Sequence, residues 1–405
     1  MNLATVSFAY LRARGLNTAL NVLLLALGIA TITLLLLTTS QLEERMQRDA
    51  RGIDLVAGAK GSPMQIILSS IYQLDVPTGN VSWKQAQELA RNRAVKKVIP
   101  LALGDNYKGF RIVGTNHEYV AHYGARLAAG RLWQKPLEAV LGADSAAATG
   151  LGIGATFLGA HGLGGGAGEH AHEAHPYEVV GVLARSGTVA DRVILTDVAS
   201  VWAVHADQYD IKDVGRIAEL MPDEEKEFTA LLIQYSSPIA AATLPRYINN
   251  NTDMQAASPA YETARLFSII GVGIDVLRGF ALVLILAAGL SVFIALYNAL
   301  LERRYDLAVM RTLGAHPGKL MALMLLEGLL LAGIGAALGI ALGHVMTEVL
   351  GVALTAAKQV SVTGWTWVND ELWLIALALA VGVVAALLPA WRAYRTDIAG
   401  TLARG

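Results

Sequence analysis

Histidine side chains gather in one window of this 405-residue chain, and imidazole is a common ligand for transition metals. Four of the nine histidines lie between positions 161 and 175, with two glutamates among them; they are His161, His170, His172 and His175. Imidazole suits Zn²⁺, Cu²⁺ or Ni²⁺, and carboxylates can complete the shell. One interpretation is therefore a metal site, with zinc as the ion. The other is a surface loop that binds metal only adventitiously, because the glycines of the window leave its backbone free.

Motifs for catalysis and nucleotide binding are missing from the sequence. The nearest approach to the GxxxxGK[ST] phosphate loop is Gly318-Lys319, where Leu313 replaces the first glycine and Leu320 replaces the hydroxyl residue. No HExxH or GxSxG arrangement marks the central part of the chain. The chain contains no cysteine, which excludes disulfides and thiolate sites. We expect a chain that is not itself an enzyme and carries no cofactor apart from the possible zinc.

Four apolar runs predict four transmembrane helices. The first lies between Arg14 and Glu43, an interval without a charged residue, and crossing a bilayer takes about 20 apolar residues. The others cover 280–300, 320–343 and 372–388, the last bracketed by Trp373 and Trp391. Only 16% of the residues are charged, against about 25% in soluble domains. The first run exceeds the apolar core of a signal peptide and no A-x-A site follows, so we expect an uncleaved span.

Basic residues in the short loops predict the orientation, because such loops are cytoplasmic. They flank the first span, fill the loop between the second and third spans, and follow the fourth: Arg12, Arg14, Arg303, Arg304, Arg311, Lys319, Arg392, Arg395 and Arg404. The loop between the third and fourth spans has Lys358 against Glu348, Asp370 and Glu371. We therefore expect both termini in the cytoplasm, and a large block between the first two spans on the outer side of a bacterial inner membrane.

The domain boundaries follow from these runs. We expect, in order, an N-terminal segment with the first span (1–40), a periplasmic domain (41–265), the second span with its periplasmic extension (266–300), a cytoplasmic loop (301–319), the third span (320–344), a periplasmic loop (345–371), the fourth span (372–391) and a cytoplasmic tail (392–405).

The central block predicts a mixed α/β domain. We expect strands at 110–113, 177–183, 192–196 and 228–235, and helices at 197–205 and 238–249. Ser82 and Gln85 form a capping-box pattern that opens a helix to about Lys97. Residues 41–62 continue the first helix and end in a glycine-rich turn.

Two features of the third span concern helix packing. Gly335, Gly339 and Gly343 repeat at four-residue spacing, which lets another helix approach closely, either within one subunit or across a dimer seam. Glu327 is a carboxylate at membrane depth. It could reach the cytoplasmic interface, bond to a neighbouring helix or couple to protons, and we favour the first two.

The 301–319 loop predicts a short amphipathic helix that ends at Gly314. Leu307, Ala308 and Met310 share one face, and the arginines project elsewhere. Such a helix at the cytoplasmic surface could present a face to a soluble partner or lie on the membrane.

This loop resembles the coupling segment of the MacB, FtsX and LolC/LolE superfamily of ABC transporter permeases, the type VII or mechanotransmission group. The matching residues are Glu302, Arg303, Arg304, Leu307, Ala308, Arg311, Leu313, Gly314 and Ala315. Glu327, a closing Pro389-Ala390 with Ala393, and the external segment formed by 179–183, Gly187, Thr188, Asp191 and Arg192 are also similar to that group.

The resemblance implies a non-catalytic permease subunit that works with a dimer of partner ATPases, which bind ATP and Mg²⁺. It also implies a second permease copy and movement of the periplasmic domain driven by ATP hydrolysis. Export, extraction of a lipoprotein or handling of a metal-linked cargo would fit, with a periplasmic adaptor, lipoprotein or binding protein as partner. The alternative functions are regulation of a periplasmic enzyme such as a cell-wall hydrolase, without transport, and a stand-alone metal-binding receptor. Nothing in the charge balance, which is −1, indicates nucleic acid.

Overall fold

The computed structural model describes residues 3–161, 175–204, 214–356 and 362–395. The chain divides into two compact units. One comprises Met1–Leu42 with Ile270–Gly405, and the other comprises Glu43–Ile269. The divisions fall inside two long helices, α2 and α10, so each of these helices belongs to both units.

The first unit is helical, as the apolar runs predict. Its elements are α1 (Leu3–Ala13), α2 (Gly15–Ala50), α10 (Pro259–Glu302), α11 (Arg304–Thr312), α12 (Pro317–Ala356) and α13 (Glu371–Tyr394). Among the described residues, four helices are long and apolar enough to cross a membrane: α2, α10, α12 and α13. The prediction of four spans is confirmed.

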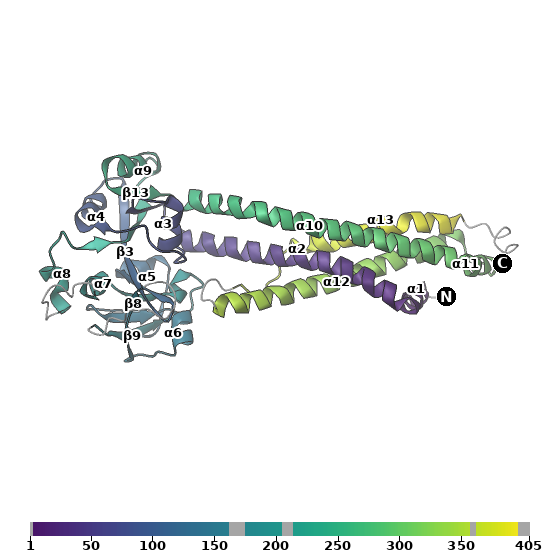
Figure 1. Cartoon of the computed structure of the whole chain (residues 1–405), viewed down its shortest axis with the longest axis horizontal. Helices are drawn as coiled ribbons and strands as arrows, with labels where there is room; N and C mark the ends of the chain where they lie inside the picture. The colour runs from purple at the N-terminus through teal and green to yellow at the C-terminus, as the bar shows by residue number, and fades with distance from the viewer. Residues whose placement is uncertain (1–2, 162–174, 205–213, 357–361, 396–405) are drawn as a thin grey trace. The chain divides into compact units, whose positions relative to one another are not determined.

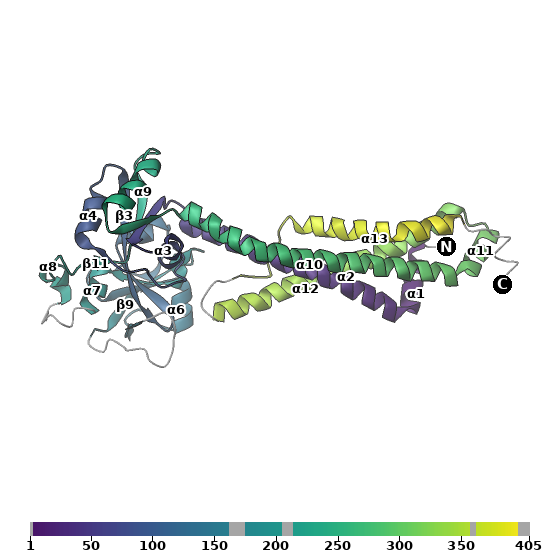
Figure 2. The same ribbon diagram turned by 45° about the horizontal axis from the view of Figure 1, so that its top comes forward.

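Packing inside the first unit joins all four spanning helices. A buried cluster takes Leu25 from α2, Ile285 from α10, Ala332 from α12 and Ala378 from α13. Helices α12 and α13 run side by side (Figures 1 and 2). They approach closely because Gly328 faces Gly382, where a β-carbon on Gly328 would lie 2.7 Å from the Gly382 carbonyl oxygen. Within lipid there is no hydrophobic driving force between helices, so close van der Waals packing stabilises their contact. Small residues at the crossing permit that packing.

The long helices extend well beyond the apolar runs. Helix α2 continues to Ala50 through charged sequence, and α10 begins at Pro259, where a proline without an N–H costs no helical hydrogen bond. The prediction of a helical continuation is therefore correct up to Ala50. It is wrong beyond that, because Leu55–Ala59 form a buried strand, β1, where a glycine-rich turn was expected.

The second unit is a mixed α/β domain, as predicted. In the described part of the chain an 11-stranded sheet has the order β13-β1-β12-β3-β4-β10-β6-β9-β5, with β7 added to β9 and β8 to β3. These strands are β1 (Leu55–Ala59), β3 (Val95–Tyr107), β4 (Phe110–Thr115), β5 (Leu127–Gly130), β6 (Glu138–Leu141), β7 (Thr156–Phe157), β8 (Ala160–His161), β9 (Tyr177–Leu183), β10 (Ile194–Asp197), β12 (Ala230–Tyr235) and β13 (Met254–Ala257). Two short strands, β2 (Val81–Ser82) and β11 (Glu227–Phe228), pair separately.

Strand β3 links the two halves of this sheet. It pairs with β12 on one side and with β4 on the other. The helix that starts after Ser82 was expected to reach about Lys97, inside the start of β3, and this was wrong because α4 (Trp83–Ala90) ends earlier. The Ser82 hydroxyl does accept from the Gln85 N–H, at 3.4 Å. The Gln85 side chain, however, reaches Asp253 instead of closing the capping box.

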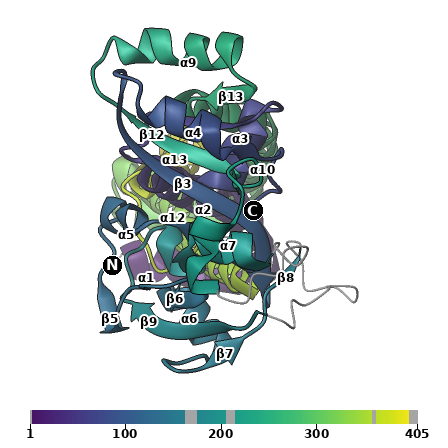
Figure 3. The ribbon, with the colours of Figure 1, turned by 90° about the vertical axis from the view of Figure 1, so that its left-hand side faces the viewer.

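Short helices cover the sheet and close two buried clusters. These helices are α3 (Pro63–Ser70), α5 (His117–His122), α6 (Ala143–Thr149), α7 (Val198–Val204), α8 (Ile217–Leu220) and α9 (Ala240–Asn251). One cluster packs Trp202 of α7 and Leu244 of α9 against Leu231 of β12, and α9 lies beside β13 (Figure 3). The other cluster packs Tyr177 and Phe157 around Ile112. The domain thus has an apolar core on both halves of its sheet.

Candidate functional site

Helix α11 is held by one apolar face. Leu307 and Ala308 are fully buried, and half-buried Met310 packs beside them. They contact a cluster supplied by the end of α10, the start of α12 and the end of α13: Leu300, Leu320, Leu323, Met324, Ala390 and Ala393. A nine-residue helix is too short to be stable alone in water, so this packing fixes its position.

The opposite face of α11 is exposed. Arg304, Asp306 and Thr312 are open to the surroundings, and the Tyr305 side chain is 54% exposed. Leu313, at the end of the helix, is 82% exposed. The surface therefore combines charged groups with an isolated leucine.

The turn after α11 has the geometry that glycine permits. Gly314 has φ +93°, a left-handed conformation that is strained for other residues. The Gly314 N–H donates to the Arg311 carbonyl at 3.1 Å, and the Ala315 N–H donates to the Met310 carbonyl at 3.0 Å. These two bonds form a Schellman motif, which satisfies the last carbonyls of the helix. The predicted end at Gly314 is where the helix stops.

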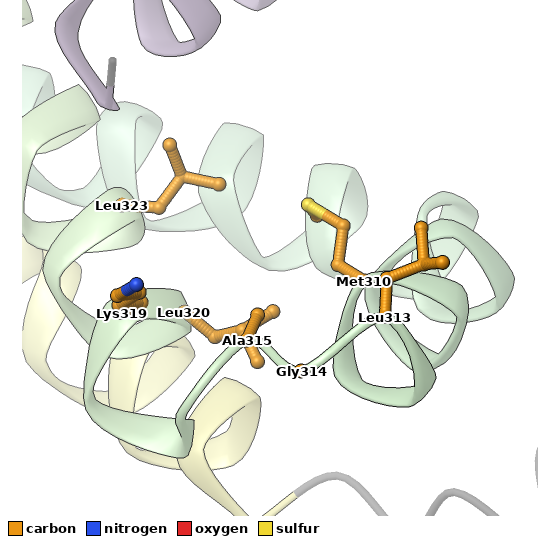
Figure 4. A pocket seen from close by; sticks show the side chains of 7 residues that line it. All are labelled: Met310, Leu313, Gly314, Ala315, Lys319, Leu320 and Leu323. Carbon is orange, nitrogen blue, oxygen red and sulfur yellow. The ribbon is translucent and has the colours of Figure 1, made fainter. Parts of the chain in front are cut away.

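A cleft lies between α11 and the start of α12 (Figure 4). Its volume is about 210 Å³, and it is lined by Met310, Leu313, Gly314, Ala315, Lys319, Leu320 and Leu323. Most of the lining is apolar, with the Lys319 ammonium as the charged group. The cleft has the size and character to accept an apolar side chain of another protein.

Arg303 turns inward, in contrast to the expectation that it projects with the other arginines. It stands at the junction of α10 and α11 with a side chain only 9% exposed. Its guanidinium donates to Glu327 of α12 at 3.0 Å and stacks on the Tyr10 ring of α1, 3.7 Å from the ring centroid. Arg14 forms a further ion pair with Glu302. Glu327 thus bonds to a neighbouring helix segment, one of the two roles favoured from the sequence.

This network ties α11 to three other helices. Both members of the Arg303–Glu327 pair are buried. Removing one partner of a buried ion pair leaves the other charge buried without compensation, which strongly destabilises the folded protein. The junction therefore cannot shift without moving α1 and α12 or breaking the pair. Sequence spacing gives no sign of the Tyr10 contact, because nearly 300 residues separate the ring from the guanidinium.

The three glycines of α12 lie against α2. A β-carbon on Gly335 would lie 2.8 Å from Leu25, and one on Gly339 would lie 2.7 Å from Ile29. On Gly343 it would lie 2.6 Å from Thr33. The stripe therefore faces a helix of the same chain.

The end of α2 is fixed within the α/β domain. One carboxylate oxygen of Asp49 accepts from the Val189 N–H at 2.8 Å, and the other lies 3.6 Å from the Arg192 guanidinium. Arg48 donates to the Gly187 carbonyl at 3.2 Å. The segment that holds the helix is the Gly187 to Arg192 turn, in which the Asp191 carboxylate accepts from the N–H groups of Ser186 and Gly187.

Comparison with known families agrees with both units. The MacB-like periplasmic core domain model matches residues 18–250, more than half of the chain. The FtsX-like permease C-terminal model matches residues 278–398, which include α11, Arg303 and Glu327. The chain is an FtsX-like ABC transporter permease with a MacB-like periplasmic core domain.

Individual relatives of the permease are distant. It is 24% identical over 123 residues to an uncharacterised ABC transporter permease of Methanocaldococcus jannaschii, a match that spans 30% of this chain and 31% of that protein. The periplasmic region of MacB from Actinobacillus actinomycetemcomitans aligns with 54% of this chain and 95% of its own, at 12% identity and a TM-score of 0.34. The extracellular domain of the noncanonic ABC-type transporter YknZ from Gram-positive bacteria aligns with 50% of this chain and 98% of its own, at 13% identity and a TM-score of 0.29.

Membership of this family has two direct consequences. The permease is a multi-pass membrane protein with four spans, and an ABC permease implies a partner ATPase. Permeases of this family are typically non-catalytic.

The histidine window is placed only in part. His161 lies in β8 opposite Asp105, and His175 precedes β9, whereas His170 and His172 lie outside the described residues. Within the described residues, no group of three or more histidine or acidic side chains is arranged to hold a metal. The predicted zinc site stays a prediction.

Proposed function

We propose that this permease converts ATP hydrolysis by its partner ATPase into movement of its α/β domain, with α11 as the coupling helix. The observation that carries the proposal is the two-faced construction of α11. One face is buried against α10, α12 and α13, and the other exposes Arg304, Tyr305 and Leu313 beside an apolar cleft. A helix built in this way transmits force from a partner to the bundle, because its inner contacts leave it no independent motion.

The Arg303 network supports transmission from α11 into the membrane. A displacement of α11 acts on α10 through the junction at Arg303, on α12 through Glu327 and on α1 through Tyr10. A buried ion pair resists being broken, so the helices move together. Arg303 therefore contributes as an internal link, whereas the residues offered to the ATPase are exposed Arg304, half-buried Arg311 and their exposed neighbours.

Helices α2 and α10 support transmission into the domain. Each is continuous from the bundle into the α/β unit, without a break in the described residues. The end of α2 is held by the Asp49 and Arg48 contacts with the 187–192 turn. The start of α10 is held by Thr263, whose hydroxyl lies 2.6 Å from the Tyr72 hydroxyl of the domain. Motion of either helix thus pulls directly on the sheet and its flanking turns.

The charge distribution supports the direction of this transfer. Basic residues around α11 and the last helix favour a cytoplasmic position for that end, where the ATPase would work, and so favour the outer side of a bacterial inner membrane for the α/β domain. A second copy of the permease completes the assembly with the ATPase dimer.

The proposal is tested by reversing charge on the exposed face of α11. We expect Arg304→Glu with Arg311→Glu to weaken ATPase docking about tenfold, which corresponds to about 1.4 kcal/mol, and so to lower permease-stimulated ATP hydrolysis in proteoliposomes. The control is Arg91→Glu with Arg246→Glu, which reverses two exposed arginines of the α/β domain. Equal stimulation by the α11 variant and the control, at equal membrane levels, would contradict the docking role.

A further inference from the structure

A histidine of α12 and a buried carboxylate meet where the loop before α13 returns to the helical unit. The His344 Nε2 lies 2.8 Å from the Glu371 Oε2, and the His344 Nδ1 contacts the Gly364 carbonyl oxygen. The Glu371 side chain is fully buried, whereas the His344 side chain is 22% exposed. All three residues belong to the first unit. The imidazole therefore joins α12 to both the loop and α13.

Both ring nitrogens of His344 face hydrogen-bond acceptors. A carbonyl oxygen only accepts hydrogen bonds, and the same is true of an ionised carboxylate. A neutral imidazole has one N–H group and satisfies one of the two acceptors, whereas the imidazolium has two N–H groups and satisfies both. Loss of the second proton leaves a ring lone pair against an oxygen, at Gly364 or at Glu371. The observed contacts therefore require one proton more than a neutral ring beside a carboxylate.

Neighbouring side chains tie the same loop to two helices. The Glu348 Oε2 of α12 accepts from the Gly364 N–H and from the Thr363 hydroxyl, both at 2.8 Å. The Gln41 side chain of α2 donates to the Thr363 carbonyl at 2.8 Å and accepts from the Thr363 N–H at 3.0 Å. The loop thus bridges α2 and α12, and His344 lies at the centre of this bridge.

Glycines let the loop lie directly on α12. A β-carbon on Gly364 would overlap the His344 carbonyl oxygen, and one on Gly351 would overlap the Val362 carbonyl oxygen. The Trp367 ring lies parallel to the imidazole, with the ring centroids 6.2 Å apart. Packing this close leaves little room for the ring to turn away from an acceptor, so loss of the proton acts on the position of the loop itself.

The charged neighbours of the imidazole, within the part of the chain that the structure describes, are carboxylates. They are Glu371 on α13, Glu348 one turn further along α12, and exposed Asp370 at the end of the loop, while α2 contributes the neutral amide of Gln41. An imidazole gains or loses its proton between about pH 5 and pH 8, where exposed carboxylates stay ionised. The group that changes charge in this range is therefore the histidine.

We propose that His344 and Glu371 form a proton-operated latch, which ties the 362–371 segment to α12 while the imidazole is protonated and releases it when that proton is lost. Release also frees Gln41, and thus α2, which is the helix that continues into the α/β domain. The latch is separate from the docking face of α11, because α11 precedes α12 and His344 lies near the end of α12.

The test measures release in the full-length permease in detergent, without the ATPase, so its result does not depend on docking. In this cysteine-free chain Val362→Cys reports release, because Val362 is 6% exposed, and Thr366→Cys at an exposed position is the reference. Dividing the two maleimide labelling rates removes the intrinsic pH dependence of thiolate reactivity. We expect the ratio to rise about 10- to 100-fold between about pH 5.5 and pH 8.5, the equivalent of one hydrogen bond to a charged group. A ratio that does not change with pH would overturn the proposal.

Two substitutions in the Val362→Cys background act in opposite directions. An amide has donors at one end only, so His344→Gln should give the high ratio at both pH values. In Glu371→Gln the amide oxygen keeps the bond from the Val368 N–H, now 2.9 Å to Oε1, and the new NH₂ group donates to the neutral ring. That variant should keep the low ratio at the higher pH. His316→Gln, at an exposed histidine of the same unit, is the control and should respond as the parent does. A rise equal to that of the parent in either latch variant would refute the latch.

Discussion

At the residue scale, buried charges in this protein are stabilised by partners that hydropathy does not reveal. Glu138 in β6 accepts two hydrogen bonds of 2.6 Å from the Arg131 guanidinium and one of 2.7 Å from the Gln134 N–H. The Arg131 bonds first, and the backbone N–H groups with them, lower the pKa of Glu138 to about 2, against the opposing effect of desolvation. The Glu138 side chain is 3% exposed, whereas its Arg131 partner is 46% exposed.

This pair predicts an acid-dependent loss of stability. A carboxyl group whose folded-state pKa is lowered stabilises the protein above its unfolded pKa, near 4.5, and this contribution is lost as the pH falls toward about 2. We expect Glu138→Gln to reduce the stability of the domain by about 1–3 kcal/mol at pH 7 and to have a shrinking effect between pH 4.5 and pH 2. Thermal unfolding of the full-length protein in detergent across this range measures it.

The control for that prediction is Glu219→Gln, since Glu219 forms an exposed pair with Arg216, and exposed pairs contribute little. A Glu138→Gln deficit that stayed constant from pH 7 to pH 2 would contradict the assigned pKa, even if the variant were less stable.

At the element scale, the sequence predicts the helices of the bundle better than the strands of the domain. Apolar runs locate the spanning helices because a helix that crosses the bilayer needs a long apolar stretch. Gly314 marks the end of α11 because its left-handed backbone conformation favours glycine. Strand β1 was missed because its glycine at position 58 suggests a turn, although the position packs against Ile66. Strand β3 was missed because its ends are polar and Pro100 stands in its middle, and its identity comes from pairing with β12 and β4.

The glycine stripe of α12 gives a prediction at this scale. We expect Gly339→Val to lower the thermal stability of the detergent-solubilised permease, by an amount equivalent to about 1–3 kcal/mol, because the new side chain would overlap Ile29 and the Ala26 carbonyl of α2. Gly333→Val is the matched control on the same helix, since a β-carbon at Gly333 meets nothing within 4 Å. Equal midpoints for the two variants would show that α2 and α12 do not meet at Gly339.

At the scale of the whole molecule, the sequence predicts the two units because each has its own sequence signal. Hydrophobicity and loop charge predict the helical bundle, and patterns of strands and turns predict the domain between its first two spans. The links between elements lie beyond such rules. Contacts such as Arg303 with Tyr10, or Asp105 with His161, join segments that only the folded chain brings together.

The proposed function requires α11 and the α/β domain to face opposite sides of the membrane, and the cysteine-free chain makes this measurable. Single cysteines replace Leu313 at the end of α11 and Ile239 before α9, which are 82% and 74% exposed. In intact cells with an opened outer membrane, a membrane-impermeant maleimide should label Ile239→Cys and spare Leu313→Cys until the inner membrane is permeabilised, because it reacts only with thiolates that water reaches. Leu286→Cys, on the apolar surface of α10, should stay unlabelled in both states because lipid covers it. Labelling of Leu313→Cys and Ile239→Cys from the same side would show that α11 and the α/β domain face the same compartment. That result would exclude transmission of motion from α11 through the bilayer to the domain.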